Sequence, residues 1–270
     1  MKTPPAARDL AIGVTVVVAL SRLTPDPFAW PIAAFLVAAT MIGVLQVLSD
    51  AVPGADIVGV PIEATLLPGL AAGASVVALQ LVPLGLWLAP AVAGLALLIL
   101  ATVSVEGRLV RASGPPSSAD RTAVGILALV VGFLAFAGIA GMLPAVAGSF
   151  DGSPLGPADP VHLVAFVSLD ALVGGVLGYR AAALRTSSVR DVGWFAIGAG
   201  MVMAIAAVAL RSIELPRLVG PALLVLVFFL WDAIHGGRPA RRHDPWRAWE
   251  TGLLAVLAVA VILWSFGLRG

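Results

Sequence analysis

The sequence predicts an all-α fold, a polytopic bundle of about nine transmembrane helices with its N-terminus in the cytoplasm. Only 11% of the residues are charged, whereas soluble domains of similar size have roughly a quarter. Hydrophobic residues make up 60% of the chain, and the mean hydropathy is +1.04. A water-soluble fold could not bury this much apolar surface, and the strands of a membrane barrel would alternate polar with apolar residues. Helices in lipid are therefore expected.

Nine apolar runs, bounded by turn or charge signals and mostly near the length that crosses a bilayer, mark the expected spans. They are Leu10 to Leu23, Pro27 to Leu48, Pro61 to Val82, Leu84 to Val105, Thr122 to Val146, Pro160 to Leu184, Val192 to Leu210, Leu218 to His235 and Pro245 to Leu268. Three starts carry an Asp-Pro pair, at Asp26, Asp159 and Asp244. Aspartate accepts a hydrogen bond at the N-cap and proline suits the first helical position, so these pairs predict helix starts.

The first span is short. Leu10 to Leu23 would reach about 21 Å at the helical rise, so the helix needs Ala6 to Asp9 as an extension. A cleaved signal peptide is the alternative, because basic residues precede the run and Ala19-Leu20-Ser21 has the pattern of a cleavage site. Asp9 and Arg22 fit that pattern poorly. An uncleaved helix is favoured, and eight spans is the alternative.

The basic residues set the expected orientation, because cytoplasmic loops of membrane proteins are enriched in Lys and Arg. With the N-terminus inside, twelve of the 16 basic residues are cytoplasmic and four are outside. The inside set is Lys2, Arg8, Arg108, Arg111, Arg121, Arg180, Arg185, Arg190, Arg238, Arg241, Arg242 and Arg247, and the outside set is Arg22, Arg211, Arg217 and Arg269.

The same distribution tests the stretch from Pro61 to Val105, which is broken only near Pro83. If this stretch crossed once rather than twice, every later loop would change sides. The sixteen basic residues would then divide into five inside and eleven outside. Two crossings are therefore predicted.

Several kinds of protein are excluded by what the sequence lacks. The chain has no cysteine, and its one lysine is Lys2, so it has no thiolate chemistry, no nucleotide-binding P-loop and no retinal Schiff base within a span. No polar segment is long enough for a soluble domain, so residues 1–270 are expected to form a single integral membrane domain. No nucleic-acid surface, cofactor site or recognised metal site is predicted. The preference for Arg over Lys is typical of GC-rich bacteria, which points to the bacterial cytoplasmic membrane.

Asp170 is the charged residue nearest the middle of an expected span, about 15 Å from Pro160 along the helix. A carboxylate at that depth costs roughly 2.5 to 3.5 kcal/mol on insertion scales, so Asp170 is expected to face the bundle interior. Gly174 and Gly178 share its face and favour close helix packing. Asp170 is therefore either a protonated acid bonded to a hydroxyl such as that of Thr40 or Ser75, or a proton or cation site.

Two further groups of residues have a structural and a functional interpretation. Gly69 and Gly73 are four residues apart on one helix face, as Gly174 and Gly178 are, and this face is expected to pack against another helix. Asp232 and His235 are three residues apart on one helix face, and Glu250 follows; together they are an interfacial cluster that could bind a metal. Headgroup exposure and helix termination explain these residues more simply, so no metal site is predicted.

The expected role is that of a non-catalytic membrane helper or partner-binding protein, because the spans offer little polar lining. A small-solute secondary transporter that uses Asp170 is the second hypothesis, since transport needs a polar path across the bilayer. A lipid-processing membrane enzyme at the Asp232 to Glu250 region is the third. Membrane lipid is the one partner that all three share.

Overall fold

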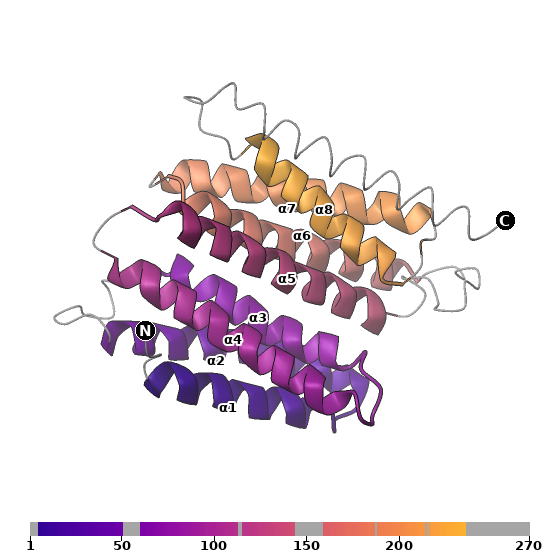
Figure 1. Cartoon of the computed structure of the whole chain (residues 1–270). Helices are drawn as coiled ribbons and strands as arrows, with labels where there is room; N and C mark the ends of the chain where they lie inside the picture. Colours follow the sequence, from indigo (N-terminus) through magenta and orange to yellow (C-terminus); the bar gives the residue numbers. More distant parts are fainter. Residues whose placement is uncertain are drawn as a thin grey trace. The chain divides into compact units, whose positions relative to one another are not determined.

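The computed structural model describes residues 5–50, 60–112, 115–143, 159–186, 188–213, 215 and 217–235. In this part of the chain every regular element is an α-helix, and Figure 1 shows the eight helices in chain order. They are α1 (Pro5–Ser21), α2 (Asp26–Asp50), α3 (Glu63–Leu79), α4 (Leu88–Arg111), α5 (Ser118–Met142), α6 (Pro160–Ala183), α7 (Val189–Ser212) and α8 (Val219–His235). The predicted span from Pro245 to Leu268 lies outside the described residues.

The two described helix starts that carry an Asp-Pro pair lie within one residue of the predicted positions. The Asp159 carboxylate accepts a hydrogen bond of 2.8 Å from the Val161 amide, and Pro160 is the first residue of α6. Helix α2 begins at Asp26 itself, one residue earlier than expected. The pair at Asp244 lies outside the described residues. Helix α1 begins at Pro5, so it includes the extension that the short first span required.

The stretch after Pro61 forms two helices, as predicted, but the break between them is wider than one residue. Residues 80–87 form turns around Pro83, and α4 begins at Leu88 rather than Leu84. Gly85 has a φ of +151°, which residues with a side chain rarely adopt. The connection therefore depends on a glycine at this position.

Three other boundaries differ from the prediction because polar residues belong to the helices. Helix α4 continues past Val105 to Arg111 and stops just before Gly114-Pro115, so Glu106 is helical. Helix α5 begins at Ser118 because the Ser117 hydroxyl accepts a bond of 3.1 Å from the Asp120 amide. Ser188 caps α7 in the same way through the Asp191 amide. A hydrophobic run does not reveal these polar first turns.

Contacts within the chain define two compact units, Met1–Gly138 and Ile139–Gly270, here called the first and the second unit. In the first unit α2 packs most extensively against α3, and α1 contacts α2, α3 and α4. Gly69 and Gly73 lie at the α2–α3 contact. A Cβ at Gly69 would lie 2.6 Å from Met41 Cγ, and one at Gly73 would lie 2.5 Å from Val37 Cγ2. Side chains larger than hydrogen at these positions would separate the helices.

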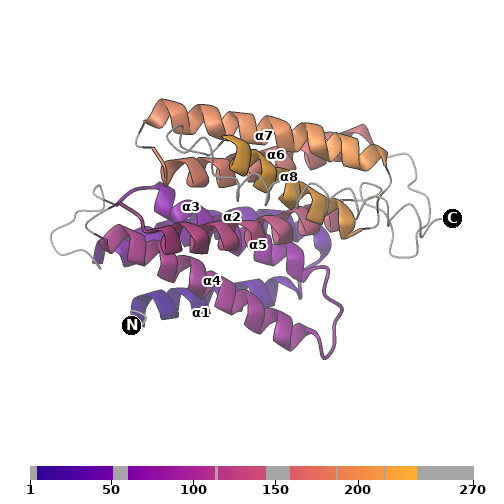
Figure 2. The same ribbon diagram turned by 45° about the horizontal axis from the view of Figure 1, so that its top comes forward.

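The second unit contains α6, α7 and α8. Helices α6 and α7 form the most extensive contact in the described chain, and α8 packs mainly on α7 (Figures 1 and 2). The connection between α6 and α7 is only a few residues long, so the two helices are antiparallel neighbours. Asp170 lies in the middle of α6.

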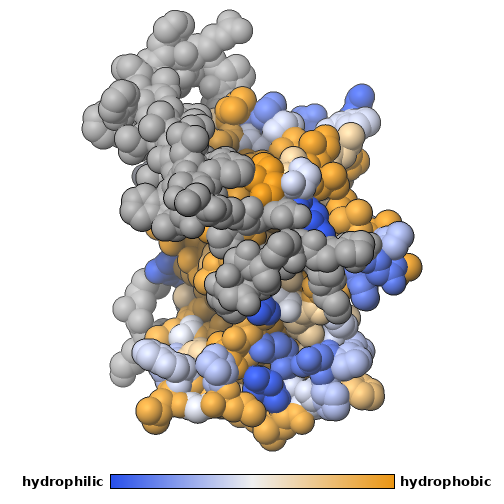
Figure 3. Space-filling model, turned by 90° about the vertical axis from the view of Figure 1, so that its right-hand side faces the viewer, coloured by the Kyte–Doolittle hydropathy of each residue, from blue (hydrophilic) through white to orange (hydrophobic). Residues whose placement is uncertain are grey.

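Five of the described helices, α2, α4, α5, α6 and α7, are long and apolar enough to cross a membrane, and α3 and α8 are shorter apolar helices. Large hydrophobic side chains such as Phe35, Leu97 and Ile205 are exposed on them. Hydrophobic residues cover much of the described surface that is visible in Figure 3. These features indicate a multi-pass helical membrane protein, in which lipid covers the apolar surface.

Candidate functional site

Asp170 is completely buried in the second unit, with an exposed fraction of 0%. Neither oxygen of its carboxyl group has a hydrogen-bond partner among the described residues. Most buried polar groups in proteins have such a partner, and an unpartnered one calls for an explanation. The interior placement agrees with the prediction from its depth in the span, and its role stays a prediction.

Helix α7 approaches α6 closely on the face that Asp170 shares with two glycines. A Cβ at Gly174 would overlap the side chain of Met203, and one at Gly178 would lie 2.7 Å from the Ala199 Cβ. In these two contacts a move of four residues forward in α6 is matched by a move of four residues back in α7, as expected for antiparallel helices. The same register puts Ala207, which is fully buried, at the level of Asp170. The residue of α7 at that level therefore offers no polar side chain.

The hydroxyl partners that the sequence suggests for Asp170 belong to the first unit. Thr40 is fully buried, and its hydroxyl has no partner among the described residues. Ser75 donates a hydrogen bond of 2.7 Å to the Ala71 carbonyl oxygen of its own helix. A bond from either hydroxyl to Asp170 would join two units that are described separately, so it stays a prediction.

An open groove between α6 and α7 is apolar. It is lined by Val167, Ala204, Ile205, Val208, Ala209 and Ser212. Asp170 is not among the lining residues, although Val167 precedes it by one turn. The groove therefore offers room for an apolar chain rather than a polar path to the carboxyl group.

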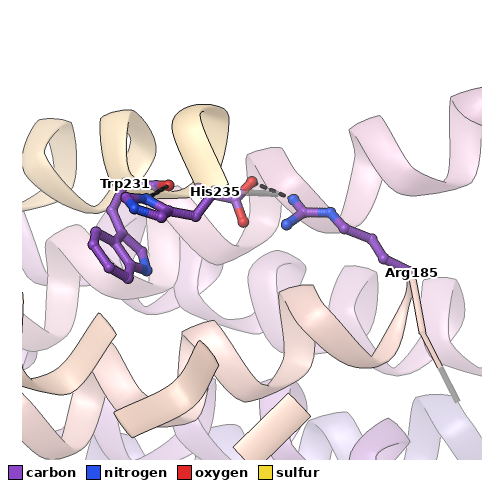
Figure 4. A network of polar contacts seen from close by, with 4 residues as sticks. Arg185, Trp231 and His235 are labelled. Carbon is purple, nitrogen blue, oxygen red and sulfur yellow. Dashed lines mark hydrogen bonds and ion pairs between the residues drawn. The ribbon is translucent and has the colours of Figure 1, made fainter. Parts of the chain in front are cut away.

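A second polar group lies at the C-terminal ends of α6 and α8. The Arg185 guanidinium donates a hydrogen bond to the Asp232 carboxylate and forms an ion pair with it (Figure 4). The side chains are 28% and 26% exposed, so water screens the pair only in part. Arg185 also lies 5.8 Å from the centre of the Phe195 ring. This arrangement ties the short connection after α6 to α8.

His235 turns back along α8 instead of pointing with Asp232. Its ring stacks on Trp231 at 3.6 Å between centres, and its Nδ1 lies 3.2 Å from the Trp231 carbonyl oxygen (Figure 4). The described residues contain no group of three His, Cys, Asp or Glu side chains that could hold a metal ion. Glu250 lies outside the described residues, so the complete interfacial cluster of Asp232, His235 and Glu250 stays untested.

Two buried charged residues were not singled out by the sequence analysis. Glu106 is completely buried in α4, and Arg180 is 5% exposed in α6; each takes part in an interaction. The expected span ends at Val105, which leaves Glu106 in the polar segment after it, and Arg180 is counted among the cytoplasmic arginines. No proline interrupts the chain between Val105 and Arg111, and this was the signal that the helix could continue past Val105 and include Glu106.

Other buried hydroxyl groups are satisfied within their own helices. Their donors bond to backbone carbonyl oxygens three or four residues earlier at 2.6 to 2.8 Å: Thr15 to Ala11, Ser21 to Val18, Thr65 to Ile62, Ser75 to Ala71 and Thr102 to Ile99. Side chains bonded in this way are not aimed at a shared path.

Comparison with known proteins identifies no relative: no family model, no curated protein and no solved structure matches the chain.

Proposed function

We propose that the chain is a multi-pass protein of the bacterial cytoplasmic membrane, with nine spans and a cytoplasmic N-terminus, that binds a partner protein and has no catalytic role. The number of spans and the orientation rest on the apolar runs and on the positive-inside distribution of basic residues. The described helices are consistent with this topology, because every predicted span up to His235 corresponds to a helix.

Partner binding is favoured because the described helices offer few polar groups that could line a path or form a catalytic site. Apart from that of Thr40, their buried hydroxyls bond to their own backbone, and the described groove is apolar. A transporter needs polar groups along a path, and an enzyme needs them clustered at a site. A protein that holds a partner helix needs only packing surfaces, which small and apolar residues provide.

Photo-crosslinking in native membranes tests this proposal. A photoreactive amino acid is introduced at Ile205 on α7 and at Ile12 on α1, which are both exposed, and at the buried Met203 as a control. A partner should give an adduct of one discrete mass from one of the exposed faces and none from Met203. Adducts with lipid alone from both faces would contradict partner binding at these faces.

The second candidate function is proton-linked movement of a small solute, and one observation favours it. A completely buried carboxyl group without a described partner is expensive to keep unless it is used. In proteoliposomes the Asp170→Asn variant would then lose pH-dependent flux of the solute while it keeps its fold. Equal flux with the parent and with Asp170→Asn would rule out this role for Asp170.

A further inference from the structure

We propose that Asp170 is a proton-binding site, in which the carboxyl group holds its proton while α6 and α7 are packed together and exchanges it only when the two helices separate. The proposal applies to a partner-binding protein and to a transporter alike, because it concerns only the packing within the second unit. It assigns a ligand to Asp170 and a conformational condition for the release of that ligand.

The first step is that no described hydrogen-bond donor stabilises a negative charge on the Asp170 carboxyl group. Asp170 is fully buried and neither oxygen has a described partner. An ionised group in such an apolar place is strongly disfavoured, so a buried acid normally becomes neutral instead. The proton is the ligand that makes it neutral.

The second step is that the described elements of the unit offer no opposite charge at the level of Asp170. The nearest titratable or charged groups on α6 are His162, Tyr179 and Arg180, about 12, 14 and 15 Å away along the helix. Helix α7 has none between Asp191 and Arg211. Arg211 lies one turn, about 6 Å, beyond Ala207, but it forms no hydrogen bond with Asp170, whose oxygens have no partner among the described residues. Helix α8 has none before Asp232. The last residues of α5, Ile139–Met142, have none either.

The third step is to decide whether the surroundings of Asp170 fit a proton or a metal cation. Ca²⁺ takes six to eight oxygen ligands and Mg²⁺ about six. The residue of α7 at the level of Asp170 is Ala207, and neither α6 nor the part of α7 after Asp191 contains a second acid. A proton needs only one oxygen, so it is the ligand that this surrounding fits.

The fourth step concerns access. Ala171, the next residue, is in backbone contact with α7, because a Cβ at Gly200 would lie 2.9 Å from the Ala171 carbonyl oxygen. Gly174 and Gly178 hold the following turns equally close. Water would reach Asp170 most directly if these contacts opened, and water would then stabilise the ionised form. Release of the proton and separation of α6 from α7 therefore favour each other, because such coupling is reciprocal.

Infrared spectroscopy of the protein in lipid at neutral pH tests the protonation. The difference between the parent and Asp170→Asn should contain the carbonyl band of a protonated carboxylic acid, and the difference for the exposed control Asp191→Asn should contain the bands of an ionised carboxylate. Carboxylate bands in the Asp170→Asn difference would overturn the proposal. If that variant did not fold, ¹³C labelling of aspartate carboxyls in the unaltered chain should shift a protonated-acid band, and the absence of any such band would overturn it equally.

The coupling to helix packing is tested by a reversible lock. The chain has no cysteine, so Gly178→Cys combined with Ala199→Cys introduces one pair. The Cβ positions are 2.7 Å apart, and a disulfide needs about 3.5 to 4.5 Å, so a small outward shift accommodates the bond. Deuterium exchange of the Asp170 acid band should slow at least tenfold on oxidation and recover on reduction. Equal exchange rates in both states would show that proton release does not depend on the separation of α6 and α7.

Discussion

Arg185 and Asp232 are 47 positions apart in the chain, and their ion pair joins the end of α6 to the end of α8. Both side chains are about one quarter exposed, so the pair is neither fully screened by water nor fully desolvated. Exposed pairs contribute up to about 1 kcal/mol, and hydrogen bonds to charged groups about 1.5 to 3 kcal/mol. A value near the lower of these ranges is expected.

A double-mutant cycle measures this contribution. Arg185→Gln and Asp232→Asn should each lower the free energy of unfolding, and the double variant should reveal a coupling of about 1 kcal/mol. Arg190→Gln is the matched control, because Arg190 lies near the same connection and is exposed. Coupling of Arg190 to Asp232 as strong as that of Arg185 would show that general charge, rather than this contact, is measured.

For single residues, the sequence predicts how deep a side chain lies within its span better than it predicts which residue that side chain contacts. The position of Asp170 within its span indicates burial, because a charge at mid-span avoids lipid. The partner of Asp232 could not be predicted, since the contact depends on how the short turn after α6 meets α8. Glu106 was missed because acidic and basic residues after Val105 resemble a loop, although they also form helices well.

The effect of replacing a glycine in α7 should depend on how closely α6 approaches that glycine. A Cβ at Gly200 would lie 2.9 Å from the Ala171 carbonyl oxygen, and backbone cannot move aside as a flexible side chain can. Gly200→Ala should therefore lower the free energy of unfolding by about 1 to 3 kcal/mol. The measurement is reversible denaturation in mixed micelles.

Gly193 provides the control on the same helix, because a Cβ there would meet no atom within 4 Å. Gly193→Ala should leave the stability unchanged or raise it slightly, since alanine favours the helix by about 0.5 to 1 kcal/mol over glycine. If both variants lost the same stability, intrinsic effects of the substitution would explain the result and close packing would not.

Gly85 permits the turn between α3 and α4 through its positive φ. Gly85→Ala should cost about 1 to 3 kcal/mol because the backbone of an L-residue is strained there. Gly94→Ala on α4, where a Cβ meets open space, should cost less than Gly85→Ala. Thermal unfolding of both variants checks the difference, and an equal loss would contradict the role of the turn.

For whole elements the hydrophobic runs predict that helices exist, and polar signals decide where they begin and end. Asp159-Pro160 gives an exact start because an acceptor and a proline act at adjacent positions. The caps at Ser117 and Ser188 lie outside the apolar runs, so the predicted starts of α5 and α7 are late by four and three residues. Ser-x-x-Asp is the pattern that identifies such starts.

For the molecule as a whole, composition predicts the helical membrane class because so little of the sequence is charged. The packing of the glycine faces into two units depends on which helices meet, and a single sequence does not contain that information. The predicted single integral domain of residues 1–270 and the ninth span are not tested by the described residues.

The orientation should depend on cytoplasmic arginines. Neutral replacement of Arg185, Arg238, Arg241 and Arg242 together should produce molecules of mixed topology, because a third of the twelve residues that hold the loops inside is lost. Protease protection of tagged protein in membrane vesicles would reveal the mixture. Replacement of the four outside arginines is the control and should leave one topology.

Labelling of single cysteines tests the proposed topology most directly, because the chain has no cysteine of its own. Cysteine is placed at Ser153 between α5 and α6, at Ser117 before α5 and at Ser187 before α7, and intact spheroplasts are treated with a membrane-impermeant thiol reagent. We predict that Ser153→Cys reacts, whereas Ser117→Cys and Ser187→Cys react only after the membrane is opened. Labelling of Ser187→Cys in intact cells, with Ser153→Cys protected, would contradict the cytoplasmic N-terminus and the alternation of the described helices on which the account rests.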